Sequence, residues 1–301
     1  MKICIAIIAF NKVKPFKRLL TSLSKVMISQ GSSVDLCFCI DGGGDPEIEQ
    51  IAKSFDWHNS QKRIFVKPTN IGLKKNVYET MKLGLEYDAL VVLEDDLYVS
   101  TQLIKYVENV LSNFPNSEKI AGFSLYSAAF NETAYCNFKP IHDGFDVFFM
   151  KVPSSWGQFY TKNQIKEYFD WYEDFEQVDL ESLPPNVSRW SHKSWKKEFF
   201  YYLIKSNKYF IYPRYSLTTN YADAGEHHTG SDMYQVPLAQ QVNNLNLVDI
   251  DNSNAVYDEY CEIEPECLNR QRTNLSIGDY LVDLYGFCLL YTLTLPTNRE
   301  V

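Results

Sequence analysis

The chain has 301 residues, of which 45% are hydrophobic, 15% aromatic and 22% charged, and its net charge at neutral pH is −9. A chain of this length and composition can bury a large core, so we expect one large domain with a C-terminal extension, or two close lobes. The acidic balance argues against a nucleic-acid-binding protein, which normally presents a basic face.

In the first 115 residues, apolar runs alternate with amphipathic helical patterns. Continuous apolar runs are typical of strands buried on both faces of a parallel sheet. Strands are predicted at 2–10, 34–40, 63–66 and 89–93, and helices at 15–26, 48–55, 76–85 and 102–114. This alternation predicts an α/β fold, a mostly parallel sheet with helices on both faces.

The pattern becomes less regular after residue 115. Strands are predicted at 121–126, 147–150 and 209–212, helices at 164–175 and 194–206, and loops at 181–188 and 220–232. An acidic segment with weak periodicity begins near residue 235. We therefore divide the chain into a ligand-binding α/β half (1–115), a second half of the same domain (116–234) and a C-terminal extension (235–301).

The seven cysteines show no CxxC pair and no Cys/His zinc spacing, which favours a reducing, cytoplasmic compartment. We interpret the opening MKICIAIIAFN as a core strand rather than a signal peptide, because a strongly polar stretch and no small-residue cleavage site follow it. The late apolar run 281–295 is interrupted by Asp283 and Gly286 and is too short to span a membrane.

Residues 91–98, VVLEDDLY, deliver three carboxylates to the end of a predicted buried strand: Glu94, Asp95 and Asp96. Ligands of open α/β sheets bind beyond the carboxyl ends of the strands, where the AFNK (9–12) and DGGGD (41–45) loops also lie. Three like charges repel one another unless a cation lies among them, and oxygen ligands suit Mg²⁺ or Mn²⁺. The alternatives are a solvated acidic turn that caps the next helix and a pair of hydrolytic carboxylates.

Asp41 ends the second predicted strand and precedes three glycines. A carboxylate there can accept a hydrogen bond from a nucleobase or a ribose hydroxyl, and glycines permit a close approach of the backbone. The alternative is an ordinary Asp-Gly turn. GGG is not the GxGxxG pattern, so a dinucleotide fingerprint is not supported.

The stretch TNIGLKKNVYETMKLGLEYDALVVLEDDLYVS (69–100) resembles the signature of bacterial family-2-like, nucleotide-sugar-dependent glycosyltransferases of the GT-A fold. In these enzymes an N-x-G-L-x-x-N segment precedes a strand that ends in an acidic triplet, the DXD motif. The EDD form is also similar to N-acetylglucosaminyltransferase I. The segments SSWGQFY (154–160), 194–229 and LSIGDYLVDLYG (275–286) resemble later parts of the same family.

The resemblance implies a role for each of these segments. Asp96 is expected to bind Mn²⁺ (or Mg²⁺) at the donor diphosphate, with His228 as a further metal ligand and His227 as its rival. The residues expected at the nucleotide sugar are Ala9, Phe10, Asn11, Asp41, Asn70, Gly72, Lys74, Lys75, Glu94 and Asp95. Trp156, Gly157 and Trp195 are expected at the acceptor. One departure is Asn220-Tyr221-Ala222, which lacks the glycine of the family's N-x-G.

Inverting transfer requires a general base that takes the proton of the acceptor hydroxyl. Relatives place an Asp or Glu near a tryptophan-bearing helix, which here reads WSHKSWKKEFF (190–200). Glu198 is the only carboxylate in this segment. Asp174 and His192 are alternatives, and an ordinary surface Glu–Lys pair remains an equal interpretation of Glu198.

These features predict an inverting, metal-dependent glycosyltransferase that uses a nucleotide sugar, most often a UDP-sugar, and a glycan or lipid-linked saccharide acceptor. The resemblance implies a cytoplasmic role in bacterial surface polysaccharide synthesis (capsule or O-antigen), with basic clusters suited to peripheral membrane contact. A sugar-phosphate nucleotidyltransferase is one alternative, although AFNKVKP lacks its glycine-rich loop. A non-catalytic glycan-binding protein on a degenerate transferase fold is another. The sequence leaves the sugar, the nucleotide and the acceptor open.

Overall fold

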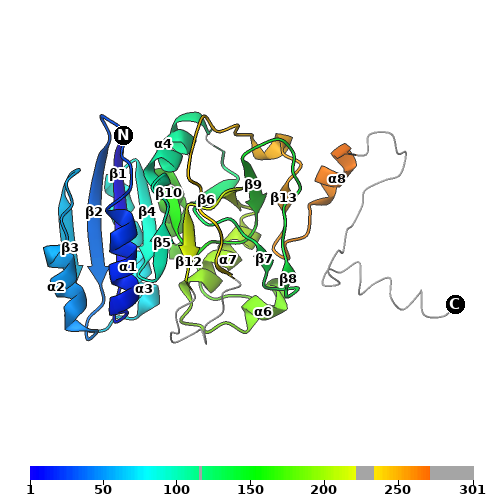
Figure 1. Cartoon of the computed structure of the whole chain (residues 1–301). Coiled ribbons are helices and arrows are strands. Elements are labelled where there is room, and N and C mark those ends of the chain that lie inside the picture. The colour runs from blue at the N-terminus through cyan, green and yellow to red at the C-terminus, as the bar shows by residue number, and fades with distance from the viewer. Residues whose placement is uncertain (115–116, 222–233, 272–301) are drawn as a thin grey trace.

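The computed structural model describes residues 1–114, 117–221 and 234–271. These residues form a nine-stranded sheet with the strand order β13-β9-β11-β6-β10-β4-β1-β2-β3, which Figure 1 shows from β3 at the left to β13 at the right. The strands are β1 (Lys2–Ala9), β2 (Ser33–Ile40), β3 (Lys62–Val66), β4 (Ala89–Glu94), β6 (Ile120–Ser124), β9 (Val147–Met150), β10 (Gln158–Thr161), β11 (Tyr209–Pro213) and β13 (Val256–Tyr257).

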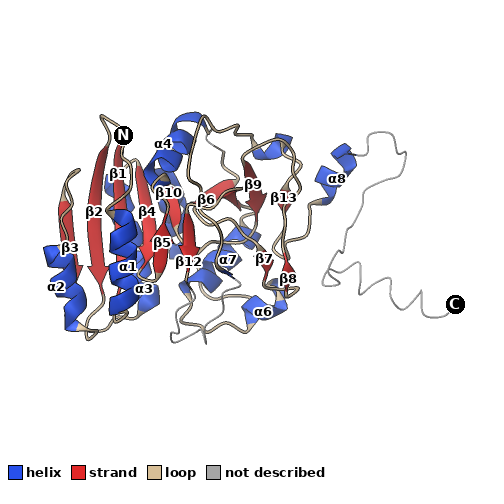
Figure 2. Cartoon of the chain, viewed as in Figure 1, coloured by secondary structure: helices blue, strands red, loops and turns tan. Residues whose placement is uncertain are grey.

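The helices of the first half alternate with the strands along the chain and lie against the sheet, whereas α8 (Pro265–Gln271) lies apart from it (Figure 2). Helix α1 packs with α2, whereas α3 contacts β1, β4 and α7. The helices are α1 (Val13–Leu23), α2 (Pro46–Ser54), α3 (Leu73–Leu83), α4 (Leu103–Asn113), α5 (Lys162–Glu173), α6 (Pro185–Ser188), α7 (Trp195–Lys205) and α8 (Pro265–Gln271). Short 3-10 turns span Gly84–Glu86, Leu180–Ser182 and Ile250–Asn252.

The first half follows the predicted parallel arrangement. Ile3 of β1 pairs with Val34 of β2 on one side and with Ala89 of β4 on the other, all in parallel register. These strands are almost entirely buried, because apolar side chains on both of their faces pack into the core. The α/β fold with a mostly parallel sheet is therefore confirmed.

The sequence did not predict β10, a four-residue strand that directly follows Ser-Ser-Trp-Gly. It runs antiparallel between β4 and β6, where Phe159 pairs with Val91 on one side and Phe123 on the other. The rings of Phe159 and Phe123 stack with centroids 4.4 Å apart. This reversed strand joins the two halves of the chain into one sheet.

Two further antiparallel pairs lie outside the main sheet. Strand β12 (Thr218–Asn220) pairs with β5 (Leu97–Val99), and β7 (Phe130–Asn131) pairs with β8 (Cys136–Asn137). Strand β13 adds to the main sheet beside β9, so part of the predicted C-terminal extension belongs to this sheet. No helix in the described ranges combines the length and the apolar character that crossing a membrane requires.

Candidate active site

The carboxylate triplet lies where the loops after β1, β2 and β4 meet. The backbone N–H of Phe10 donates to Asp95 Oδ2 at 3.3 Å, and Lys12 Nζ forms an ion pair with Asp96 Oδ2 at 2.8 Å. The backbone N–H of Asp45 donates to the carbonyl of Phe10 at 3.2 Å. The predicted convergence of these three loops at one sheet edge is therefore present in the structure.

Burial makes the triplet costly to charge without a cation. Burial, together with the charges of Asp96 and Asp95, raises the pKa of Glu94 to about 8, and burial together with Asp96 raises the pKa of Asp95 to about 7. Burial alone would lower the pKa of Lys12, but the attraction of Asp96 outweighs it and raises that pKa. The site is thus organised around positive charge, which Lys12 supplies.

Asp96 has one oxygen available for a further ligand. Its Oδ2 accepts from Lys12, but its Oδ1 is buried and has no hydrogen-bond partner among the described residues. A buried carboxylate oxygen without a partner is unfavourable, and a hard cation would satisfy it. Within the described ranges, no three His, Cys, Asp or Glu side chains are arranged as a complete metal site. A cation here would therefore also need oxygen atoms from substrate or water.

His228, the expected further metal ligand, lies outside the described residues. His227 and the segment 275–286 lie outside them as well. Residues of β12 are nevertheless next to the triplet, because Asn220 pairs with Leu97, the residue that follows Asp96. The resemblance implied that the segment 194–229 approaches the triplet. Strand β12, which belongs to this segment, places Asn220 beside Leu97.

Asp41 shapes the loop that precedes α3. Its carboxylate accepts from the backbone N–H groups of Gly42 (2.9 Å), Ile71 (2.8 Å) and Gly72 (3.0 Å). Asn70 Oδ1 accepts from the same Gly72 N–H at 2.9 Å. Oδ1 of Asp41 already has two donors, so only Oδ2 keeps capacity for one more, such as a nucleobase N–H.

The glycines after Asp41 serve contacts within the protein. A Cβ atom on Gly44 would overlap the carbonyl oxygen of Phe10, so only glycine allows the loops after β1 and β2 to touch. Ala9 is buried in β1, whereas Asn11 and Lys75 are exposed at the same edge. The close approach predicted for a ligand is made here by the neighbouring loop.

Glu198 is buried and engaged. It lies on α7 opposite α3, where its Oε1 forms a 2.5 Å ion pair with Lys74 Nζ and its Oε2 accepts from Tyr78 at 2.6 Å and from Tyr172 at 3.3 Å. The carboxylate is thus held by three side chains. Glu198 does pair with a lysine, as the surface-pair interpretation expected, but it is only 8% exposed and belongs to a network, so its predicted surface location is wrong.

The other expected acceptor-side residues are scattered. Asp174 and His192 are exposed, and the carbonyl of His192 accepts from Lys74 at 3.3 Å. Trp195 is 3% exposed and its ring packs edge-on against Phe199, so in this conformation it is a core residue and offers no face to an acceptor. Trp195 differs from the prediction because the first turn of α7 packs against the core and buries its ring.

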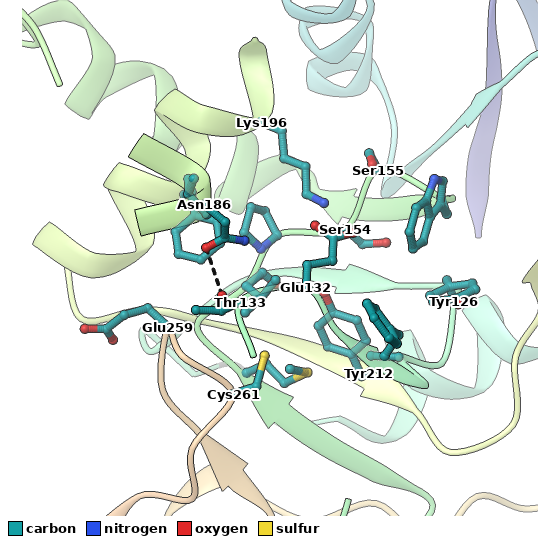
Figure 3. A pocket seen from close by; sticks show the side chains of 18 of the residues that line it. Tyr126, Glu132, Thr133, Ser154, Ser155, Asn186, Lys196, Tyr212, Glu259 and Cys261 are labelled. Carbon is teal, nitrogen blue, oxygen red and sulfur yellow. Dashed lines mark hydrogen bonds between the residues drawn. The ribbon is translucent and has the colours of Figure 1, made fainter. Parts of the chain in front are cut away.

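Trp156 lines a cavity in the second half of the chain (Figure 3). The ring centroid of Trp156 lies 4.8 Å from that of Tyr126. Lys196 Nζ lies 5.6 Å from the ring centroid of Trp156 and 5.2 Å from that of Trp190. Gly157 adopts a φ of +89°, which places the following strand β10. Lys196 and Glu132 also line the cavity, but the sequence analysis gave neither a role at the site. Lys196 belongs to the WSHKSWKKEFF segment, whereas no motif marks Glu132.

Among solved structures, the chain is similar to S. aureus TarS 1–349 in complex with UDP-GlcNAc, with 13% identity, a TM-score of 0.50, and 77% of this chain and 61% of that chain covered. Mouse xyloside xylosyltransferase 1 gives 11% identity, a TM-score of 0.44, and 69% and 84% coverage. A mannosyltransferase from Pyrobaculum calidifontis in complex with GDP-Man and Mn²⁺ gives 6% identity, a TM-score of 0.38, and 55% and 46% coverage.

The match covers about three fifths of the length of the two TarS 1–349 chains that this chain resembles. No protein-family model and no curated protein sequence matches it. At these identities the likeness concerns the fold alone, which in this chain is the nine-stranded mixed sheet with its helices. The chain therefore has a GT-A-like glycosyltransferase fold.

Proposed function

We propose that this protein is an inverting, metal-dependent glycosyltransferase that transfers a sugar from a nucleotide sugar, most simply a UDP-sugar, to a hydroxyl group of a glycan or lipid-linked saccharide. The observation that carries the proposal is the buried Oδ1 of Asp96 at the end of β4, which has no partner within the described part of the chain. The raised pKa values of Glu94 and Asp95 support a site that needs a cation.

In this proposal the three loops hold the donor. Asp96 would hold Mn²⁺ or Mg²⁺, which when bound supplies positive charge for the departing diphosphate. Lys12 adds a second positive charge at the same point, and Glu94 and Asp95 orient the ribose and the sugar. Asp41 keeps its Oδ2 oxygen for the nucleobase of the donor. Lys74 holds Glu198 in position on α7, in the second half of the chain. The cytoplasmic face of a bacterial membrane, in surface polysaccharide synthesis, is the setting that the resemblance favours.

A thermal-shift titration with UDP and UDP-GlcNAc, each with and without Mn²⁺, tests the central claim. A ligand at 100 times its Kd stabilises the folded state by about 2.7 kcal/mol. We expect this stabilisation to require Mn²⁺ and to be lost in Asp96→Asn, which keeps the side-chain shape but weakens the cation ligand. Asp56→Asn, an exposed carboxylate at a distance, is the control and should respond as the wild type does.

The proposal fails if neither UDP, GDP nor their sugars stabilise the protein in an Mn²⁺-dependent way. A protein that binds saccharides but no nucleotide would instead be a glycan-binding protein on a transferase fold. Nucleotide binding that persists without metal and depends on Lys12 would assign the positive charge of the site to Lys12 alone.

A further inference from the structure

The cavity around Trp156 lies beside the end of β4 that carries the carboxylate triplet. The ammonium group of Lys196 lies over the rings of Trp156 and Trp190, which belong to the cavity wall. Trp156 of the cavity wall stands two residues before Gln158, which pairs with Val92 of β4. Because β10 runs antiparallel to β4, the residues before Gln158 lie toward the Glu94 end of β4, so the cavity adjoins that end.

Glu132 lies in the wall of this cavity, in the turn between β7 and β8. Figure 3 shows Glu132 and Lys196 reaching into the cavity from opposite walls. Burial raises the pKa of Tyr126, another residue of the cavity wall, and the negative charge of Glu132 adds to this rise. Across the described residues, no hydrogen bond or ion pair engages the Glu132 carboxylate.

The turn that carries Glu132 is held in place by buried polar contacts. Asn131, which is fully buried, accepts from the N–H groups of Thr133 (2.9 Å) and Ala134 (3.0 Å) and donates to the carbonyl of Tyr260 (3.0 Å). Thr133 Oγ1 is hydrogen-bonded to Asn186 Oδ1 of α6 at 3.0 Å. The carboxylate of Glu132 is thus presented by a fixed scaffold, as a positioned catalytic group requires.

The other acceptor-side carboxylates are less suited to accept a proton. Glu198 is already held by Lys74, Tyr78 and Tyr172. Glu259 also lines the cavity, but Figure 3 shows its carboxylate pointing away from Lys196. Glu132 is therefore the carboxylate of the cavity that combines an unengaged side chain with a position facing Lys196.

We propose that the cavity holds the acceptor sugar against its aromatic wall and that Glu132 is the general base of the transfer, an inference that rests on the proposed function. The acceptor O–H proton passes to the Glu132 carboxylate while the acceptor oxygen forms a bond to C1 of the donor sugar. The bond between C1 and the diphosphate oxygen breaks, and its electron pair leaves with the nucleoside diphosphate. Six of the side chains that line the cavity are aromatic and three are charged. Such a lining offers ring faces to a saccharide and a few charged groups that orient its hydroxyls.

The test follows UDP release from UDP-GlcNAc with Mn²⁺, with water as the acceptor probe, as a function of pH. Loss of a general base lowers kcat by about 10²–10⁴-fold. We expect Glu132→Gln to show this loss with the KM for UDP-GlcNAc changed by less than about threefold. The rise of kcat with pH on its acidic side, which reports deprotonation of the base, should also disappear. Glu132→Asp should recover part of the rate, because it restores the charge.

Glu266→Gln, an exposed carboxylate on α8, is the matched control and should keep the wild-type rate and pH profile. An active wild type whose Glu132→Gln variant keeps kcat and the acidic limb would overturn this inference and leave the proposed function intact. A wild type that binds nucleotide with Mn²⁺ but releases none from UDP-GlcNAc, UDP-glucose or GDP-mannose would also overturn it. Absence of any nucleotide binding would refute the proposed function itself.

Discussion

At the scale of single residues, surroundings rather than residue type separate the acidic side chains. Glu198 and Glu132 are both glutamates of the second half of the chain, yet Glu198 is surrounded by donors and Glu132 has none among the described residues. Glu198 is buried and Glu132 is half-buried in the cavity wall, so the two glutamates differ in burial as well as in partners. The Glu198 carboxylate is already engaged by a lysine and two phenols, whereas the Glu132 carboxylate is not.

Glu198→Gln should therefore act mainly on stability. The substitution removes the charge that pairs with Lys74, which is only partly exposed, and leaves Tyr78 with a weaker acceptor. We expect the free energy of unfolding to fall by about 1–3 kcal/mol. Urea denaturation measures this change.

A double-mutant cycle with Lys74→Met separates the ion pair from the rest of the network. The coupling between the two positions should be clearly positive, because each single variant leaves the other group without its partner. Additive effects of the two substitutions would show that the ion pair contributes nothing. Glu198 would instead be the general base if Glu198→Gln loses most of its kcat while it remains folded and Glu132→Gln keeps part of its activity.

At the scale of elements, β10 depends on the glycine before it. Gly157 has a φ of +89°, and a Cβ atom there would lie 2.7 Å from Cγ2 of Thr218. Thr218 in turn donates to the carbonyl of Trp156 at 2.5 Å. The turn into β10 thus requires both a left-handed backbone and space beside β12.

Gly157→Ala should destabilise the protein more than Gly144→Ala does. Gly144 has a similar φ of +91°, but a Cβ atom there would meet no described atom within 4 Å, so it reports the backbone cost alone. That cost is about 1–2 kcal/mol. The additional loss in Gly157→Ala should be partly restored by Thr218→Ser, which removes Cγ2 and keeps the hydroxyl. Equal stabilities of the two alanine variants, measured by urea denaturation, would contradict this account.

At the scale of the whole molecule, β10 makes the two halves one structure. It lies between β4 of the first half and β6 of the second, and Phe159 is fully buried between Val91 and Phe123. A junction inside a continuous core couples the unfolding of both sides. The sheet edge that carries the carboxylate triplet and the cavity around Trp156 are therefore expected to lose their structure together.

Phe159→Ala should lower the free energy of unfolding by about 3–5 kcal/mol, the usual cost of removing a buried aromatic ring. Because the ring lies at the junction, we expect a single transition at lower denaturant concentration, seen equally by tryptophan fluorescence and by circular dichroism. Two separate transitions in the wild type would mean that the halves are independent folding units.

The sequence by itself determined the main strands and helices of the first half and the location of the carboxylate triplet. Apolar runs encode strands buried on both faces, and the position of Glu94, Asp95 and Asp96 directly after such a run fixes them at the carboxyl edge of the sheet. These properties are local, since periodicity and turn residues act within a few positions along the chain.

Only the tertiary structure decided which side chains meet. Lys12 and Asp96 are 84 positions apart, and Lys74 and Glu198 are 124 positions apart, so no local pattern relates either pair. The reversal of β10, the core position of Trp195 and the orientation of Glu132 toward Lys196 likewise depend on how distant elements pack. Burial and partners, which decide whether a carboxylate binds a cation, holds a helix or accepts a proton, come into existence only when those elements are brought together.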